Sequence, residues 1–426
     1  MPELRHRPLL RLAGDAQAEL VAGARDREPV RGLTHGFYKY PARFSPSFVR
    51  AAIDIFTRPG DLVFDNHVGG GTTLVEAMAL GRHAIGIDIS PLAEFVASVK
   101  TTIFDEVELD RLSAWTTRIA KAVHMHKVSR HFAGYGELGY YKHLDHPARW
   151  RLRKAIEQAI ASAMRLRSER LEAFGRCAVL RTGQWALDGR RKLPTIHEFR
   201  NMLTETATEM LAGARALRTA VNRYTCPPAV RVLNRSAVGL EEDPQLMDCT
   251  PRLILTSPPY PGVHVLYHRW QVDGRKEAPL PFIIANKLDG AGSSYYTMGD
   301  RKFPELKTYF ANLRATMSSV AALADTSTIV VQMVAFADPT WQLTRYLETM
   351  EEAGLSELFL PALQGTGDGR LWRSVPNRRW YSDQRGDTPG SAEVVLIHRK
   401  RPDTIIQNRQ QLRSQVYKHP LGYPPR

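Results

Sequence analysis

Hydrophobic and polar positions follow two different patterns along the chain. Within residues 34–100, short apolar runs are each followed by a polar turn and a stretch of helical composition. The run 62–64 ends at Asp65, and the run 84–87 ends at Asp88. Apolar runs of this length that alternate with helices predict parallel strands joined by crossover helices, so the region is expected to form a βαβ unit.

Helical spacing replaces this pattern in the middle of the chain. Leu152, Ile156, Ile160 and Met164 are four residues apart, as on one face of a helix, and such stripes are typical of a core. Apolar runs return after residue 229, and we expect further strands at 230–233, 253–255, 328–334 and 393–397. The pattern predicts an α/β fold, a Rossmann-like, doubly wound, mostly parallel sheet interrupted by a mainly helical insertion.

This pattern suggests boundaries for the parts of the chain. Residues 1–31 are expected to be a loosely ordered, charged lead-in, and residues 403–426 a C-terminal tail. One discontinuous α/β domain would comprise residues 32–103 and 225–402, and the helical insertion would comprise residues 104–224.

Composition and charge limit the classes of function. The chain has 426 residues, of which 43% are hydrophobic, so a large core is expected. The formal net charge is +14, and residues 148–223 contain 16 Lys and Arg against seven Asp and Glu. A surplus of this kind favours a polyanionic partner such as DNA, although a well-solvated helical surface would also account for it.

Other features of the composition bear on metal binding and location. The three cysteines are far apart in the sequence and form no CxxC pair, so we expect neither a metal site nor a disulfide framework. The charged N-terminus and the lack of a long apolar run predict a soluble, cytoplasmic protein without membrane contact.

A glycine-rich turn follows the first predicted strand, where open α/β sheets bind ligands. It runs through residues 65–73, and the acid Asp88 ends the next strand 17 residues beyond Gly71. Glycines let the backbone approach a ligand closely, and an acid at about this spacing reaches ribose hydroxyls in dinucleotide folds. The turn lacks the Lys and Ser or Thr ending of a triphosphate-binding loop, so an adenosine-containing cofactor is favoured.

A second turn, Thr-Ser-Pro-Pro-Tyr at residues 256–260, follows the strand 253–255 at the same edge of the sheet. An exocyclic amine of a base is a poor nucleophile, and the Ser257 hydroxyl and Pro258 carbonyl are acceptors for its protons. Tyr260 offers a flat face on which a flipped or single-stranded base can stack. A rigid structural turn is the alternative. If the first turn holds a cofactor that reacts with a base held by the second turn, the turns at Asp65 and Tyr260 must lie side by side.

These segments resemble motifs of the S-adenosylmethionine-dependent DNA amino-methyltransferases that modify cytosine N4 or adenine N6. Residues 257–260 resemble catalytic motif IV, residues 65–73 motif I, residues 34–44 motif X and residues 86–88 motif II, and residues 234–236 stand about where motif III is expected. The resemblance implies catalytic roles for Ser257, Pro258, Pro259 and Tyr260. It implies that the cofactor, S-adenosylmethionine, is bound by Tyr38, Lys39, Pro41, Asp65, Asn66, His67, Gly69, Gly71, Thr72, Thr73, Asp88, Ile89 and Ser236.

A serine at the head of motif IV is more common among N4-cytosine enzymes, so the resemblance favours a site-specific cytosine-N4 methyltransferase that acts on a flipped base in double-stranded DNA. Adenine N6 methylation uses the same mechanism and remains an alternative, as does a catalytically silent DNA-binding subunit. A restriction or phage-defence partner and the oligomeric state stay open.

Two departures from the family pattern bear on these alternatives. The usual Pro-Phe of motif I is Asn66-His67 here, and the helical insertion lies between motifs II and III. Late in the chain, residues 370–373 and 377–380 form a basic and aromatic cluster that would either contact phosphates or close a hairpin.

Overall fold

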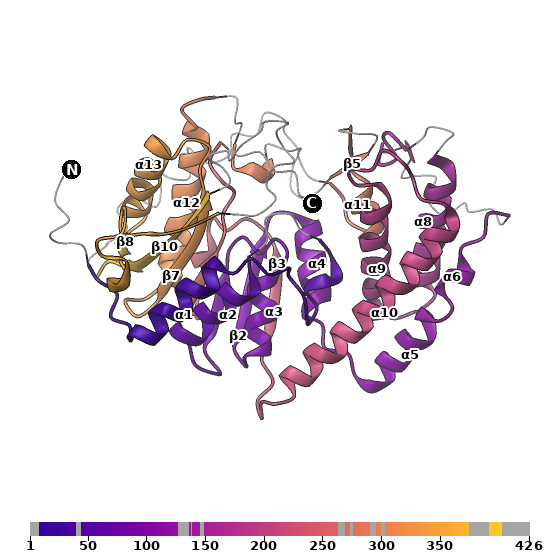
Figure 1. Ribbon diagram of the computed structural model, residues 1–426, viewed down its shortest axis with the longest axis horizontal. Coiled ribbons are helices and arrows are strands. Elements are labelled where there is room, and N and C mark those ends of the chain that lie inside the picture. The colour runs from indigo at the N-terminus through magenta and orange to yellow at the C-terminus, as the bar shows by residue number, and fades with distance from the viewer. Residues whose placement is uncertain are drawn as a thin grey trace.

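The computed structural model describes residues 8–39, 44–126, 136–137, 139–144, 149–262, 269–272, 276–289, 295–299, 303–374 and 392–402. Among the positions singled out in the sequence, Pro41, residues 377–380 and the tail 403–426 lie outside these ranges. Within them, a central sheet is covered by helices on both faces, and a second group of helices lies beside it (Figure 1).

The central sheet has eight strands in the order β3-β2-β1-β4-β7-β10-β8, with β9 also paired to β10. The first five strands of this order are parallel, and β10 runs antiparallel to β7, β8 and β9. The predicted mostly parallel, doubly wound sheet is therefore confirmed. The strands are β1 Leu62–Asp65, β2 His83–Asp88, β3 Val230–Asn234, β4 Leu253–Thr256, β7 Ile329–Ala335, β8 Leu355–Leu358, β9 Leu371–Ser374 and β10 Ala392–Lys400.

Two hydrophobic clusters fill the two faces of this sheet. Side chains of α1, α2 and α3 cover one face, and side chains of α12 and α13 cover the other. Helix α4 packs on β2 and β3. The central strands β4 and β7 are buried along their whole length, as expected for parallel strands between two helical layers. These helices are α1 Gly14–Arg25, α2 Pro46–Phe56, α3 Thr72–Ala79, α4 Pro91–Thr101, α12 Lys307–Leu323 and α13 Pro339–Glu352.

The expectation of a loosely ordered lead-in is wrong for Gly14–Arg25, which form helix α1. Leu20 and Ala24 are fully buried on this helix and pack into the cluster that contains α2. A Cβ at Gly23 would lie 3.0 Å from the Ser47 carbonyl oxygen, so the missing side chain allows the two helices to approach closely. Leu10 also attaches the segment before α1 to the rest of the fold, because its amide donates to the Phe359 carbonyl.

The described part of the helical insertion contains helices and no strand. Its helices are α5 Glu106–Thr116, α6 Ile119–Ala122, α8 Trp150–Met164, α9 Glu169–Leu187 and α10 Ile196–Val221. They gather on one side of the molecule, and the long α10 reaches back toward α3 (Figure 1). One hydrophobic cluster joins these helices to α4 and to the segment around Phe37 and Tyr38.

A small hairpin and a short helix that follow the second turn also pack on this helical group. They are β5 Trp270–Val272, β6 Lys276–Ala278 and α11 Leu280–Ile284. Trp270 is buried, and a Cβ at Gly183 of α9 would lie only 2.7 Å from its ring. Trp270 therefore lies in the core of this helical group, on a strand. None of the helices among the described residues is long and apolar enough to cross a membrane.

Candidate functional site

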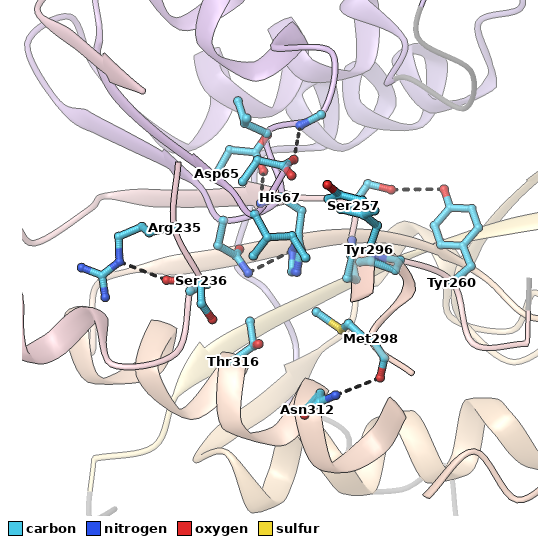
Figure 2. Close-up of a pocket in the computed structure, with 18 of the residues that line it drawn as sticks. Asp65, His67, Arg235, Ser236, Ser257, Tyr260, Tyr296, Met298, Asn312 and Thr316 are labelled. Atoms are coloured by element: carbon cyan, nitrogen blue, oxygen red, sulfur yellow. Dashed lines mark hydrogen bonds between the residues drawn. The ribbon is translucent and has the colours of Figure 1, made fainter. Parts of the chain in front are cut away.

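The turns at the ends of β1 and β4 lie side by side, because these two strands are neighbours in the sheet. His67 of the first turn and Thr256, at the end of β4, are 3.2 Å apart between Nδ1 and Oγ1. Both turns line one cavity, which contains about 1090 Å³ of empty space, its open mouth included. The required neighbourhood of the two turns is confirmed (Figure 2).

Most of the residues predicted from the sequence line this cavity. They are Asp65, Asn66, His67, Gly69, Thr72, Asp88, Ile89, Ser236, Ser257, Pro258, Pro259 and Tyr260. Gly71 and Thr73 lie in the same turn without lining the cavity. Gly71 adopts a φ of 73° at the start of α3, and a Cβ there would lie 3.1 Å from the Ala97 Cβ. Glycine is therefore required by both the backbone conformation and the packing on α4.

A buried lysine fixes the middle of this glycine turn. The Lys100 amino group donates to the Gly70 carbonyl at 2.7 Å, and the Thr34 hydroxyl donates to the Lys100 carbonyl. These bonds connect helix α4, the glycine turn and the segment before α2. The turn is thus held from outside the cavity, while its inner surface remains open to a ligand.

Two acidic side chains stand at the ends of neighbouring strands on the cavity wall. Asp88 accepts hydrogen bonds from the Gly69 amide through Oδ2 and from the Ser90 amide through Oδ1. Burial raises the pKa of Asp88 to about 6, and these two hydrogen bonds oppose the rise. Because each carboxylate oxygen has a further lone pair, Asp88 can also accept from two hydroxyls of a ligand.

Asp65 lies at the end of β1 and organises the start of the first turn. Burial raises its pKa to about 6, against hydrogen bonds from Thr73, the His67 amide and Thr256. The Asp65 carboxyl therefore ties both turns together, because Thr256 immediately precedes the Ser-Pro-Pro-Tyr sequence.

His67 stands where the family pattern has phenylalanine, and it packs without a charge. Burial lowers the pKa of His67 to about 3, so the ring is neutral at physiological pH. Its Nδ1 contacts the Asn66 Nδ2 at 3.0 Å as well as Thr256. Among the described residues, neither His67 Nε2 nor Asn66 Oδ1 has a hydrogen-bond partner. The pair thus adds polar atoms to the turn where the family pattern has apolar side chains.

The second turn is held by hydrogen bonds from behind. The Ser257 hydroxyl lies 3.0 Å from the Met333 carbonyl of β7 and 3.1 Å from the Tyr260 hydroxyl, and Figure 2 shows Ser257 and Tyr260 pointing toward one another. Tyr309 of α12 donates to the Pro259 carbonyl at 2.6 Å. No donor among the described residues is bonded to the Pro258 carbonyl, so that oxygen can accept from a ligand.

Among the described residues of the motif X-like segment, Phe44 alone is brought to the cavity. Phe44 lines the cavity, whereas Tyr38 and Lys39 do not. The Tyr38 hydroxyl accepts from Trp270 Nε1 at 3.0 Å, and both backbone polar groups of Lys39 bond to the Gln184 side chain. The Tyr38 hydroxyl and the Lys39 backbone therefore face the helical group, because they bond to β5 and α9.

Other cavity residues were not assigned a role from the sequence, although Phe44, Val68, Gly70 and Arg235 lie within the motif-like segments. The full set is Phe44, Val68, Gly70, Arg235, Ala237, Val238, Tyr296, Met298, Asn312 and Thr316. Several are immediate neighbours of the motifs and could have been found by extending them. Asn312 and Thr316 are four residues apart on α12 and so share the helix face opposite the two turns (Figure 2). Among the described residues, no group of three His, Cys, Asp or Glu side chains is placed to hold a metal ion.

Comparison with known proteins bears on the first turn. A family model described as DNA methylase, which covers N6 and N4 enzymes, matches residues 23–97. Methyltransferase M.MjaII of Methanocaldococcus jannaschii is 37% identical over 78 residues, which is 18% of this chain and 15% of that protein. Methyltransferase M.MvaI of Kocuria varians is 33% identical over 82 residues, or 18% of each. Both are type II methyltransferases, and the chain matches less than a fifth of their length.

Solved structures of other methyltransferases align over more of the chain but with low scores. The rRNA methyltransferase aviRa of Streptomyces viridochromogenes has a TM-score of 0.33 and 11% identity, covering 88% of this chain and 96% of that one. TrmN of Thermus thermophilus has a TM-score of 0.28 and 12% identity, covering 84% and 49%.

The matched residues contain α2, the glycine turn, Asp88 and most of α4, so the family match and the cavity coincide along this part of the chain. The family implies S-adenosylmethionine as the methyl donor. Over residues 23–97, the chain is therefore similar to the DNA methylases of the N6 and N4 group and to type II methyltransferases.

Proposed function

We propose that this chain is a site-specific DNA methyltransferase that transfers the methyl group of S-adenosylmethionine to the exocyclic N4 of a flipped cytosine. The observation that carries the proposal is the single cavity shared by the glycine turn and the Ser-Pro-Pro-Tyr turn. A donor held by one turn would face an acceptor held by the other, as direct transfer between two ligands requires.

The residues of the first turn fit an adenosylated donor. Asp88 presents carboxylate lone pairs at the end of β2, and Ser236 follows the neighbouring β3 on the same cavity wall. We assign the ribose hydroxyls to Asp88 and place the adenine beside Ile89 and Ser236. When bound, S-adenosylmethionine supplies a methyl group on a positively charged sulfur. The ionised Asp65 at the end of β1 would stabilise such a charge.

The second turn fits an amine acceptor. The Ser257 hydroxyl and the Pro258 carbonyl are two acceptors in adjacent residues, and an exocyclic amine has two protons to donate. Hydrogen bonds from the amine to these oxygens would orient the nitrogen lone pair toward the methyl group and localise it there. The Tyr260 ring lines the cavity next to them, and we assign to it the stacking of the flipped base.

We further propose that the helical region 104–224 grips the DNA, with the catalytic domain formed by residues 32–103 and 225–402. The surplus of Lys and Arg in residues 148–223 supports this role. The hairpin Trp270–Val272 and Lys276–Ala278 packs on the same helices shortly after Tyr260, so it physically connects the base site with the DNA-binding region. Such a protein would act in the cytoplasm, where its DNA substrate is found.

Ser257 at the head of the second turn supports cytosine over adenine, because the family commonly has Asp or Asn at this position in adenine enzymes. Cells that express the protein and lack other methyltransferases give the test. Methylation-sensitive sequencing of their DNA should reveal N4-methylcytosine in a fixed sequence context, and the Ser257→Ala variant should lose it. N6-methyladenine alone would contradict the choice of base. A folded protein that modifies no base and binds no S-adenosylmethionine in calorimetry would indicate a silent subunit.

A further inference from the structure

We infer that Glu393 is a positioning residue for methyl transfer, which sets the direction of the Ser257 hydroxyl through Tyr260. This inference rests on the proposed function and concerns a residue that lies 133 positions beyond Tyr260 in the sequence. Glu393 lies on β10, opposite Ala335 of β7 and opposite Arg373 of β9. It does not line the cavity, so it acts through other residues.

The Glu393 carboxylate is buried, with 2% of the residue exposed, and both of its oxygens are engaged. Oε1 accepts from the Tyr260 hydroxyl at 2.7 Å, and Oε2 accepts from Arg373 Nε at 2.8 Å. The Arg373 Nη2 is also 2.6 Å from Oε2. Arg373 therefore compensates a charge that would otherwise be buried alone directly behind the second turn.

The direction of the hydrogen bonds follows from the chemistry of the groups. A carboxylate only accepts, so the one proton of the Tyr260 hydroxyl is donated to Glu393. The Tyr260 oxygen is then an acceptor for Ser257 at 3.1 Å. The other partner of Ser257, the Met333 carbonyl, also only accepts. In either case the Ser257 proton is directed at a protein acceptor, and the lone pairs of Ser257 are left for the protons of the target amine.

Without the carboxylate, the Tyr260 hydroxyl would be free to donate to Ser257. Such a bond would use a Ser257 lone pair, and the Ser257 proton could turn into the cavity toward the amine. The Ser257 hydroxyl and the target amine would then face each other as two hydrogen-bond donors at the reacting nitrogen. The affinity for the donor, which is held by the first turn, would be unaffected. Loss of Glu393 is therefore expected to act on turnover rather than on binding.

A purely structural role would be that Arg373 and Glu393 simply hold β9 against β10. The same sheet contains a matched pair for comparison. Arg370, next to β9, donates to both oxygens of Glu357 on β8 at 2.6 and 2.8 Å. This pair is similarly enclosed, and neither member lines the cavity or bonds to the second turn. The Glu357→Gln variant thus removes an equivalent ion pair from the same edge of the sheet.

The test measures steady-state methylation of DNA by the full chain and its variants. Glu393→Gln should reduce kcat about tenfold or more, the equivalent of one hydrogen bond to a charged group, with both KM values within about threefold of wild type. Tyr260→Phe keeps the Arg373 pair intact and removes the hydroxyl that could donate to Ser257, while the Met333 carbonyl still accepts the Ser257 proton, so adding Glu393→Gln to Tyr260→Phe should cause no further loss of kcat. Because both act through the same hydroxyl, the double variant should lose no more than either alone. Glu357→Gln should retain the wild-type kcat.

An unchanged kcat in Glu393→Gln would overturn the inference, as would equal losses in Glu357→Gln or multiplied losses in the double variant. If Glu393→Gln alone does not fold, a kcat of the double variant below that of Tyr260→Phe would overturn it as well. Wild-type protein that transfers no methyl group would instead contradict the proposed function, and the inference with it, so the two failures are distinguishable.

Discussion

The raised pKa of Asp88 predicts how cofactor binding depends on pH. If the ionised carboxylate accepts two hydroxyls of the ligand, protonation below a pKa of about 6 replaces an acceptor with a donor and weakens binding. At pH 5 only about one tenth of such a group is ionised, so the affinity for S-adenosylmethionine should be about tenfold lower than at pH 8. Asp65, with a pKa also of about 6, would add up to a further tenfold if its charge is needed.

The effect of these two groups on the stability of the fold has the opposite sign to their effect on ligand affinity. An acid whose pKa is raised in the folded protein destabilises the fold as the pH rises from the ordinary pKa of 3.8 toward the raised pKa of about 6. Acidification through this window therefore relieves the cost of both buried charges. A loss of affinity between pH 8 and pH 5 would therefore reflect weaker ligand binding, and not a loss of stability caused by protonation of Asp88 or Asp65.

Isothermal titration calorimetry between pH 5 and pH 8 measures this dependence directly. Asp88→Asn should bind about tenfold or more weakly at pH 8, because it loses a charged acceptor, and should lack the part of the pH dependence due to Asp88. Asp61→Asn, which changes an acid just before β1 outside the cavity lining, serves as the control and should behave as wild type. Wild-type affinity that stays constant down to pH 5 in the folded protein would refute the role assigned to Asp88.

Two further substitutions test the first turn. Gly71→Ala and Gly60→Ala both place a side chain at a positive φ, but only at Gly71 does the new Cβ meet Ala97, at 3.1 Å. In urea denaturation Gly71→Ala should therefore lose about 1–3 kcal/mol more than Gly60→Ala, and equal losses would contradict the close packing of the turn. His67→Phe should keep the affinity for S-adenosylmethionine within about threefold but lose about 1–2 kcal/mol of stability, because the Asn66 amide loses a partner. A large loss of affinity with unchanged stability would instead mean that the imidazole binds the ligand.

The local sequence was sufficient to predict the two turns and the sheet except for its short strands β8 and β9. Short apolar runs that end at Asp65 and Asp88 indicate where strands stop, and parallel strands bring their ends to one edge. The neighbourhood of the glycine turn and Ser257 follows from that rule. Helix α1 was missed because its buried apolar face is small, with Leu20 and Ala24 as its buried apolar side chains, and its stability comes from packing on α2.

The remaining parts of the site depend on contacts between distant segments, which periodicity does not encode. Tyr38 matches a cofactor motif in the sequence, yet its hydroxyl bonds to Trp270, a residue of a hairpin that the sequence did not predict. Glu393 looks like one polar residue at the start of an apolar strand. Its contact with Tyr260 arises only from the position of β10 beside β7.

The most direct test of the account uses the purified protein, duplex DNA and S-adenosylmethionine that has a deuterated methyl group. The DNA is then digested to nucleosides and examined by mass spectrometry, with Ser257→Ala as the control. The account predicts deuterated N4-methylcytosine from the wild type and none from the variant. Deuterated N6-methyladenine as the sole product would contradict the assigned base, and no labelled nucleoside from protein that binds both ligands would contradict methyl transfer between the two turns.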